Sequence, residues 1–156
     1  MRITLIIVTL GLLSSLMAVP LKCVAPHAPP KKDWIKDWYL ILAKTEYSKY
    51  KDLLGYLESG NQLLIQGGAG NKYRSIYQFC KETSEYVGVP YDSLFSLKWS
   101  DLALERFTGN NWYLLRDYHH YQGKVIKGIK ITKAGMLAGA HLKGWSFVKL
   151  FLISNG

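Results

Sequence analysis

From residue 33 onward, apolar and aromatic residues recur at spacings of three and four, which predicts a mainly helical protein. Leu53, Leu54 and Leu57 show this spacing, and Gly60 follows them at a position typical of a helix end. Thr132 precedes a similar stretch and is a predicted N-cap. The predicted helices cover residues 33–44, 45–58, 75–87, 97–107, 111–121, 132–142 and 147–153.

Two segments interrupt the helical pattern. Residues 61–71 contain several glycines and predict a loop, whereas residues 123–131 alternate and predict either a small β excursion or an ordered loop. Gly88 and Gly109 are each expected to end a helix. The predicted fold class is therefore mainly α, with a possible small β excursion near residues 123–131.

The N-terminus has the pattern of an export signal. Arg2 precedes an apolar run over residues 3–17, shorter than the roughly 20 residues of a membrane-spanning helix. We interpret residues 1–18 as a signal peptide, with an uncleaved anchor as the alternative. Residues 19–32 contain four prolines and predict an arm or linker before a domain over residues 33–156. The expected location is secreted, in the periplasm or outside the cell, without a stable membrane span after signal removal.

Composition limits the choice of partner. The chain has 156 residues, enough for one domain with a core, and a formal net charge of +9. Such a charge favours an anionic polymer or surface, and export disfavours nucleic acid, which leaves the cell envelope. Cys23 and Cys80 are the only cysteines. In an oxidising compartment they predict a disulfide; the alternative is a buried, free Cys80 and an unpaired Cys23.

Glu58 is the strongest candidate for chemistry. It falls on the last turn of a predicted helix, beside the Ser59 hydroxyl and just before the turn at Gly60. A carboxyl group held at a rigid helix end suits general acid catalysis, although a glutamate at such a position is more often a solvated surface residue. His119 and His120 do not predict a metal site, because adjacent helical residues point about 100° apart.

Three short motifs occur in order: Glu58-Ser59-Gly60, Tyr77-Gln78-Phe79 and Ala140-His141-Leu142. This arrangement resembles the lysozyme-like superfamily, in particular lytic transglycosylases and phage-type muramidases that cut peptidoglycan. The resemblance covers roughly two thirds of the chain, from about Lys49. It implies a lysozyme-like helical domain that acts on peptidoglycan glycan strands without cofactor or metal.

The resemblance also implies roles for individual residues. Glu58 would protonate the glycosidic oxygen between N-acetylmuramic acid and N-acetylglucosamine, and Ser59 would hold that carboxyl group or contact a sugar. Tyr77 and Gln78 would bind the acetamido groups and stack on a sugar face. His141 stands where relatives of the soluble transglycosylase type carry a tyrosine that orients the acid. From the residues alone, Tyr77 is equally compatible with a core aromatic, and His141 with a packing histidine.

The chain departs from the family pattern at several positions. Lys72 and Ser75 stand where glycines are expected, as do Lys143 and the pair Ser146-Phe147. Side chains at these positions are expected either to narrow the cleft or to shift the helix. An inverting hydrolase also needs a second carboxylate about 6.5–9.5 Å from the acid, and only Asp92 and Asp101 are candidates, by default. We therefore favour a lytic transglycosylase over a muramidase; the alternative function is a non-catalytic peptidoglycan-binding or structural envelope protein.

Overall fold

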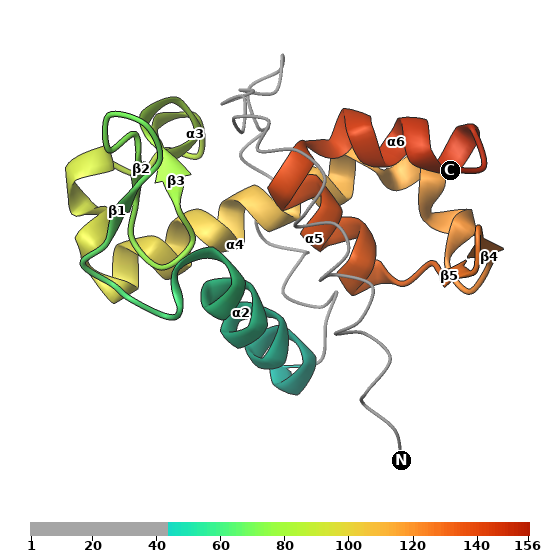
Figure 1. Ribbon diagram of the computed structural model, residues 1–156, viewed down its shortest axis with the longest axis horizontal. Coiled ribbons are helices and arrows are strands. Elements are labelled where there is room, and N and C mark those ends of the chain that lie inside the picture. The colour runs from blue at the N-terminus through green and yellow to red at the C-terminus, as the bar shows by residue number, and fades with distance from the viewer. Residues whose placement is uncertain (1–43) are drawn as a thin grey trace.

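The computed structural model describes residues 44–156, which form a mainly helical structure with two small antiparallel sheets (Figure 1). The predicted signal peptide, the proline-rich arm and nearly all of the predicted helix at 33–44 lie outside the described residues, so they stay predictions. Within residues 44–156, no helix has the length and apolar character needed to cross a membrane.

The α-helices are α2 (Lys44–Ser59), α3 (Lys81–Tyr86), α4 (Leu97–Leu114), α5 (Lys133–Lys143) and α6 (Trp145–Ile153), and the 3-10 helices are η3 (Tyr91–Phe95) and η4 (Arg116–Tyr121). The strands are β1 (Gln66–Gly67), β2 (Tyr73–Arg74), β3 (Phe79–Cys80), β4 (Val125–Ile126) and β5 (Ile129–Lys130). The strands of each sheet are antiparallel neighbours, in the order β1-β2-β3 and β4-β5.

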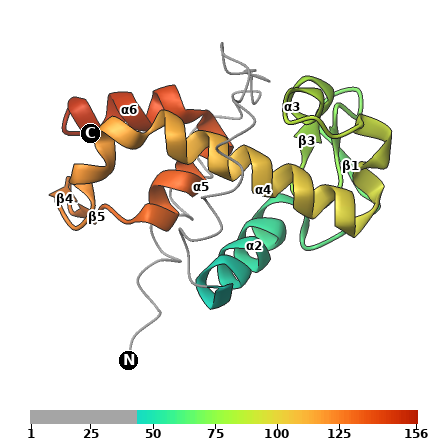
Figure 2. The same cartoon turned by 180° about the vertical axis from the view of Figure 1, so that it is seen from behind.

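Helix α4 connects two groups of elements (Figure 1). It crosses the molecule behind α5 in one view and in front of α5 in the view from behind (Figure 2). The prediction that Gly109 ends a helix was wrong, because α4 continues through it to Leu114. A glycine inside a helix costs about 1 kcal/mol relative to alanine, and the buried Phe107 and Asn111 on either side offset that cost. Residues 116–121 then form the 3-10 helix η4, not the predicted α-helix.

The prediction of a helix from residue 75 was also wrong. Ser75 and Gln78 have φ angles of 70° and 49°, in the left-handed region, which a right-handed helix cannot contain. The chain instead turns from β2 into β3, pairing Tyr73 with Cys80, and α3 begins only at Lys81. The predicted loop at 61–71 contains the short strand β1.

Other boundaries were confirmed. The chain leaves α2 at Gly60, whose φ is 63°. Thr132 caps α5, since its hydroxyl accepts a hydrogen bond from the Gly135 amide at 3.0 Å. The β excursion within 123–131 is the hairpin β4–β5, in which Ile126 pairs with Ile129.

Two apolar cores flank the middle of α4. The first is centred on the fully buried Leu94 and Leu104 and includes Leu137 of α5; the second is centred on Leu115 and Leu152. Trp112 packs against both cores. We call residues 44–111 the N-terminal lobe and residues 112–156 the C-terminal lobe. Each fully buried leucine contributes about 2 kcal/mol, and α5 contributes residues to both cores.

Candidate active site around Glu58

Glu58 is the penultimate residue of α2. It follows Tyr50 and Leu54 at intervals of four residues, so the three side chains share one helix face. Tyr50 and Leu54 are 7% and 2% exposed, which shows that this face is packed against the core. The spacing that anchors α2 therefore also turns the Glu58 carboxyl group inward, where water cannot solvate its anion well.

Burial changes the acidity of Glu58. Its side chain is 10% exposed, and its Oε1 is buried without a hydrogen-bond partner among the described residues. Desolvation raises the pKa of Glu58 from 4.5 to about 7, because burial disfavours the anion, and no charged neighbour contributes to the rise. A substantial fraction of this carboxyl group therefore remains protonated at neutral pH.

His141 reaches the site from α5. Its ring packs edge-on against Phe79 and Phe107, with ring centroids 5.5 and 5.6 Å away. Its Nε2 lies 3.1 Å from the carbonyl oxygen of Tyr77, which can only accept, so Nε2 carries the proton of the neutral ring. Burial lowers the pKa of His141 to about 4, and this hydrogen bond opposes the fall only in part.

The same His141 nitrogen lies 3.8 Å from Glu58 Oε1. The structure thus brings together Glu58 of the first motif and His141 of the third, which are 83 residues apart in the sequence. Near neutral pH the imidazole is neutral, so this contact is dipolar and not an ion pair. The Nε2–H bond is directed at the Tyr77 carbonyl oxygen, and at 3.8 Å the same nitrogen forms no hydrogen bond with the Glu58 carboxyl group.

Ser59 has a local structural role in this structure. It is 8% exposed, and its hydroxyl donates to the Gly55 carbonyl at 3.1 Å. The same oxygen accepts a hydrogen bond from the Gln62 amide at 3.2 Å. Both contacts stabilise the end of α2 and the turn after it, and so fix the backbone that carries Glu58.

Tyr77 is only 3% exposed, and its ring belongs to the first core. Its hydroxyl donates to Asp101 at 2.8 Å, and Asp101 also pairs with Lys51 at 2.5 Å. The Tyr77 backbone, by contrast, orients His141 through its carbonyl oxygen. The structure therefore places this residue beside the site as a packing and positioning group.

Gln78 is half-buried and its amide folds back over its own turn. Its Nε2 donates to the Ser75 carbonyl at 2.7 Å. Gly67 of β1 lies against the same amide, and a Cβ at that position would fall 2.1 Å from Gln78 Oε1. A side chain at residue 67 would therefore require the Gln78 amide to move.

Ser75 has an unusual backbone conformation. Its φ of 70° lies in the left-handed region, which favours glycine. The Ser75 side chain is fully buried and its hydroxyl forms a hydrogen bond with that of Ser100. Ser100 in turn donates to the Leu94 carbonyl at 2.8 Å. The Ser75 side chain is thus directed toward α4.

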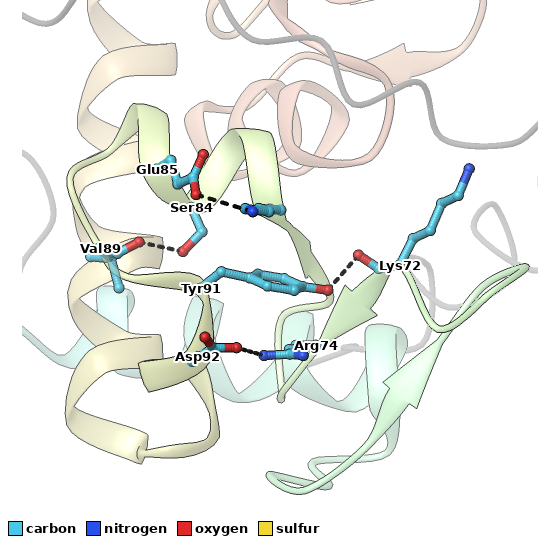
Figure 3. Close-up of polar contacts among 8 residues, drawn as sticks. Lys72, Arg74, Ser84, Glu85, Val89, Tyr91 and Asp92 are labelled. Carbon is cyan, nitrogen blue, oxygen red and sulfur yellow. Dashed lines mark hydrogen bonds and ion pairs between the residues drawn. The ribbon is translucent and has the colours of Figure 1, made fainter.

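Lys72 contacts η3 through its backbone. Its carbonyl accepts a hydrogen bond from the Tyr91 hydroxyl at 2.8 Å, and its side chain extends away from that contact into solvent (Figure 3). Arg74 lies over the Tyr91 ring at 4.0 Å and pairs with Asp92 at 2.5 Å. These contacts attach β2 to η3. After the third motif, Lys143 at the end of α5 and Ser146 and Phe147 at the start of α6 are exposed.

Neither candidate for a second carboxylate contacts Glu58. The Asp92 side chain is 92% exposed and paired with Arg74. Asp101 is bound by Lys51 and Tyr77. Both aspartates are thus paired with other side chains, and within the described part of the chain no charged group contributes to the raised pKa of Glu58.

The two adjacent histidines have other contacts. His119 stacks on Trp112, with ring centroids 3.5 Å apart, and its Nε2 lies 3.1 Å from the Trp112 carbonyl oxygen. His120 is exposed beside Tyr121. Within residues 44–156, no group of three or more His, Cys, Asp or Glu side chains is arranged to hold a metal ion. Cys80 is buried at the start of α3 and is disulfide-bonded, so the alternative of a free Cys80 was wrong; Cys23 lies outside the described residues.

Around the site, Tyr50 was missed from sequence, whereas Phe79 of the second motif and Phe107 were given no role beside Glu58. Tyr50 lies near Glu58, whose negative charge raises the pKa of Tyr50 beyond the effect of burial. Phe79 and Phe107 form the apolar surroundings of His141. Tyr50 could have been found from sequence, because it shares a four-residue spacing with Leu54 and Glu58. The contact of β3, α4 and α5 could not be predicted from a local pattern.

Comparison with protein-family models, with curated proteins and with solved structures gives no match for this chain.

Proposed function

We propose that the protein is a peptidoglycan-cleaving enzyme of lysozyme-like architecture, with Glu58 as its general acid. The observation that carries the proposal is the state of this carboxyl group. It is fixed at a helix end, buried, and has a pKa of about 7 caused by desolvation alone. A carboxylic acid that stays protonated near neutral pH is what cleavage of a glycosidic bond needs.

In the proposed reaction, Glu58 donates its proton to the glycosidic oxygen as the bond from that oxygen to C1 of N-acetylmuramic acid breaks. The resulting carboxylate accepts the proton of the muramyl 6-hydroxyl, whose oxygen bonds to C1 and closes an anhydro ring. One carboxyl group thus serves as acid and then as base, and no external water is consumed.

Two features support this transglycosylase route over hydrolysis with inversion. The candidates for a second carboxylate, Asp92 and Asp101, are each held by other side chains. The neutral His141, whose Nε2 lies 3.8 Å from Oε1, adds no proton of its own to the Glu58 carboxylate between the two steps. The expected products are muropeptides with anhydro ends.

Digestion of purified peptidoglycan tests the proposal, with products identified by mass spectrometry. The wild-type protein is expected to release muropeptides, and Glu58→Gln is expected to lower the rate at least a thousandfold, since the amide cannot donate an acidic proton. Glu82→Gln, the same change at an exposed residue of α3, is the matched control and is expected to retain full activity. Circular dichroism of all three proteins checks that the fold is kept.

The alternative function has its own result. If the wild-type protein co-sediments with peptidoglycan sacculi but releases no fragments, the enzyme proposal fails and a binding or structural protein remains. If fragments are released equally by Glu58→Gln, the assignment of the acid fails. Reducing ends in place of anhydro ends would reject the transglycosylase route and leave hydrolysis.

A further inference from the structure

The charges of the protein are divided unequally between the two lobes. The N-terminal lobe contains eight Lys and Arg and eight Asp and Glu, which balance. The C-terminal lobe contains seven Lys and Arg but only one acidic residue, Asp117, for a net charge of +6. A field of one sign over one lobe attracts an anionic surface to that side of the molecule.

Helix α6 presents an apolar stripe on the charged lobe. Phe147, Leu150 and Ile153 are 52%, 59% and 49% exposed. Their spacing of three residues places them on one face, whereas Val148 and Leu152 on the opposite face are buried in the second core. Ser146 and Ser154, which immediately precede and follow these three residues in the sequence range 147–153, are exposed and carry no charge.

Basic side chains lie at both ends of this stripe. Lys143, the last residue of α5, is exposed just before α6 begins. At the other end the chain returns to the β4–β5 turn, where the exposed Lys127 lies against Gly156. Figure 1 shows α6 along the edge of the C-terminal lobe, with the chain end and the hairpin beyond it.

We propose that the α6 face, defined as Phe147, Leu150 and Ile153 with Lys127 and Lys143, docks on an anionic lipid surface. An apolar stripe flanked by lysines suits the boundary between acyl chains and acidic headgroups. There the apolar side chains contact acyl chains and the lysines contact headgroups, and both contacts are favourable. The helix would lie in the plane of the surface and would not span it.

Charge distinguishes this occupant from the others. A purely ionic polymer offers no apolar phase for the three hydrophobic side chains. A second copy of the protein would bring one lobe of net charge +6 against another, and residues 1–43 of the same chain carry a net charge of +3, so both are repelled. An anionic lipid surface complements the apolar stripe and the positive charge together. This inference does not depend on the proposed enzymatic activity.

Hydroxyl-radical footprinting of the full chain provides the local test. With vesicles of phosphatidylcholine and phosphatidylglycerol in equal parts, the Phe147 and Leu150 side chains are expected to lose reactivity several-fold. Leu53 and Leu57 on α2, which are 48% and 47% exposed in the N-terminal lobe of zero net charge, are the internal control and should stay reactive. Vesicles of phosphatidylcholine alone should protect neither pair. Because the readout is residue by residue, lipid contact by another segment does not imitate it.

Variants test the energetic contribution. Replacing Phe147, Leu150 and Ile153 together by Gln should weaken vesicle binding at least tenfold, while Leu53→Gln with Leu57→Gln should not change it. Lys127→Asn with Lys143→Gln should weaken it about thirtyfold at low salt, or roughly fivefold for each lysine. Asparagine suits residue 127, whose φ is 46°.

Three results would overturn the proposal: unchanged reactivity of Phe147 and Leu150 on anionic vesicles, equal protection of the α2 pair, or unchanged binding by the triple Gln variant. A dimer in analytical ultracentrifugation that the triple variant dissolves would assign the face to self-association instead. Circular dichroism and thermal unfolding of each variant confirm that the lobe is folded, and the exposure of the replaced side chains makes a folding defect unexpected.

Discussion

His141 Nε2 lies 3.8 Å from Glu58 Oε1, yet the two side chains do not form an ion pair near neutral pH. Burial acts on them in opposite directions, raising the pKa of Glu58 to about 7 and lowering that of His141 to about 4. Between about pH 4 and pH 7 each group therefore favours its neutral form, whereas an ion pair would require both groups to be charged. Their opposed titrations lead to two linked predictions on stability.

Glu58→Gln is expected to stabilise the protein at alkaline pH. A raised folded-state pKa contributes stability that is complete below the unfolded value of 4.5 and is lost as pH rises through about 7. Above pH 7 the variant should exceed the wild type by about 3 kcal/mol, and the difference should shrink toward pH 4. Urea unfolding at several pH values measures it, with Glu82→Gln as control. A difference that does not vary with pH would contradict the assigned burial.

His141→Gln is expected to show the opposite trend. A lowered folded-state pKa contributes stability that is present above the unfolded value of 6.5 and lost as pH falls through about 4. As pH falls from 7 to below 4, the free energy of unfolding of the wild type should therefore decrease by about 3 kcal/mol because of this group. The variant should not show this decrease. His120→Gln, at an exposed position, is the control. Since the two titrations nearly cancel between pH 4 and 7, only the single variants reveal them.

Tyr77→Phe is expected to lower stability by about 2 kcal/mol, because the hydroxyl donates to a carboxylate in a partly buried setting. Asp101 keeps its pair with Lys51, which limits the loss. Thermal unfolding against Tyr56→Phe, where the ring is 66% exposed, measures the difference. Equal unfolding temperatures for the two variants would show that the Tyr77 hydroxyl is not structurally important.

Ser75→Gly is expected to be more stable than Ser75→Ala by about 1 kcal/mol. Both variants lose the hydrogen bond to Ser100, but only alanine keeps a Cβ at a φ of 70°. The same pair of changes at Ser48, an exposed residue inside α2, should give the reverse order, because glycine weakens a helix. Chemical unfolding of the four variants tests this, and the same order at both positions would be evidence against it.

The elements with strong local signals could be predicted from sequence. Leucine spacing and Gly60 defined α2 and its end, and Thr132 marked the start of α5. Alternation indicated the hairpin β4–β5. The errors came where tertiary contacts outweighed local preference: burial around Gly109 let α4 continue, and left-handed backbone at Ser75 and Gln78 replaced a predicted helix by a turn and a strand.

The candidate site divides in the same way. The sequence by itself determined that Glu58 stands at a helix end, on the face shared with Tyr50 and Leu54, because helical spacing is a local property of the chain. The tertiary structure decided its acidity and its neighbour. Desolvation depends on the atoms packed around a group: His141, which lies beside the Glu58 carboxyl group, comes from α5, and the rings packed on His141 come from β3 and α4. Likewise, folding directed Tyr77 and Ser75 into packing contacts, which residue type alone could not indicate.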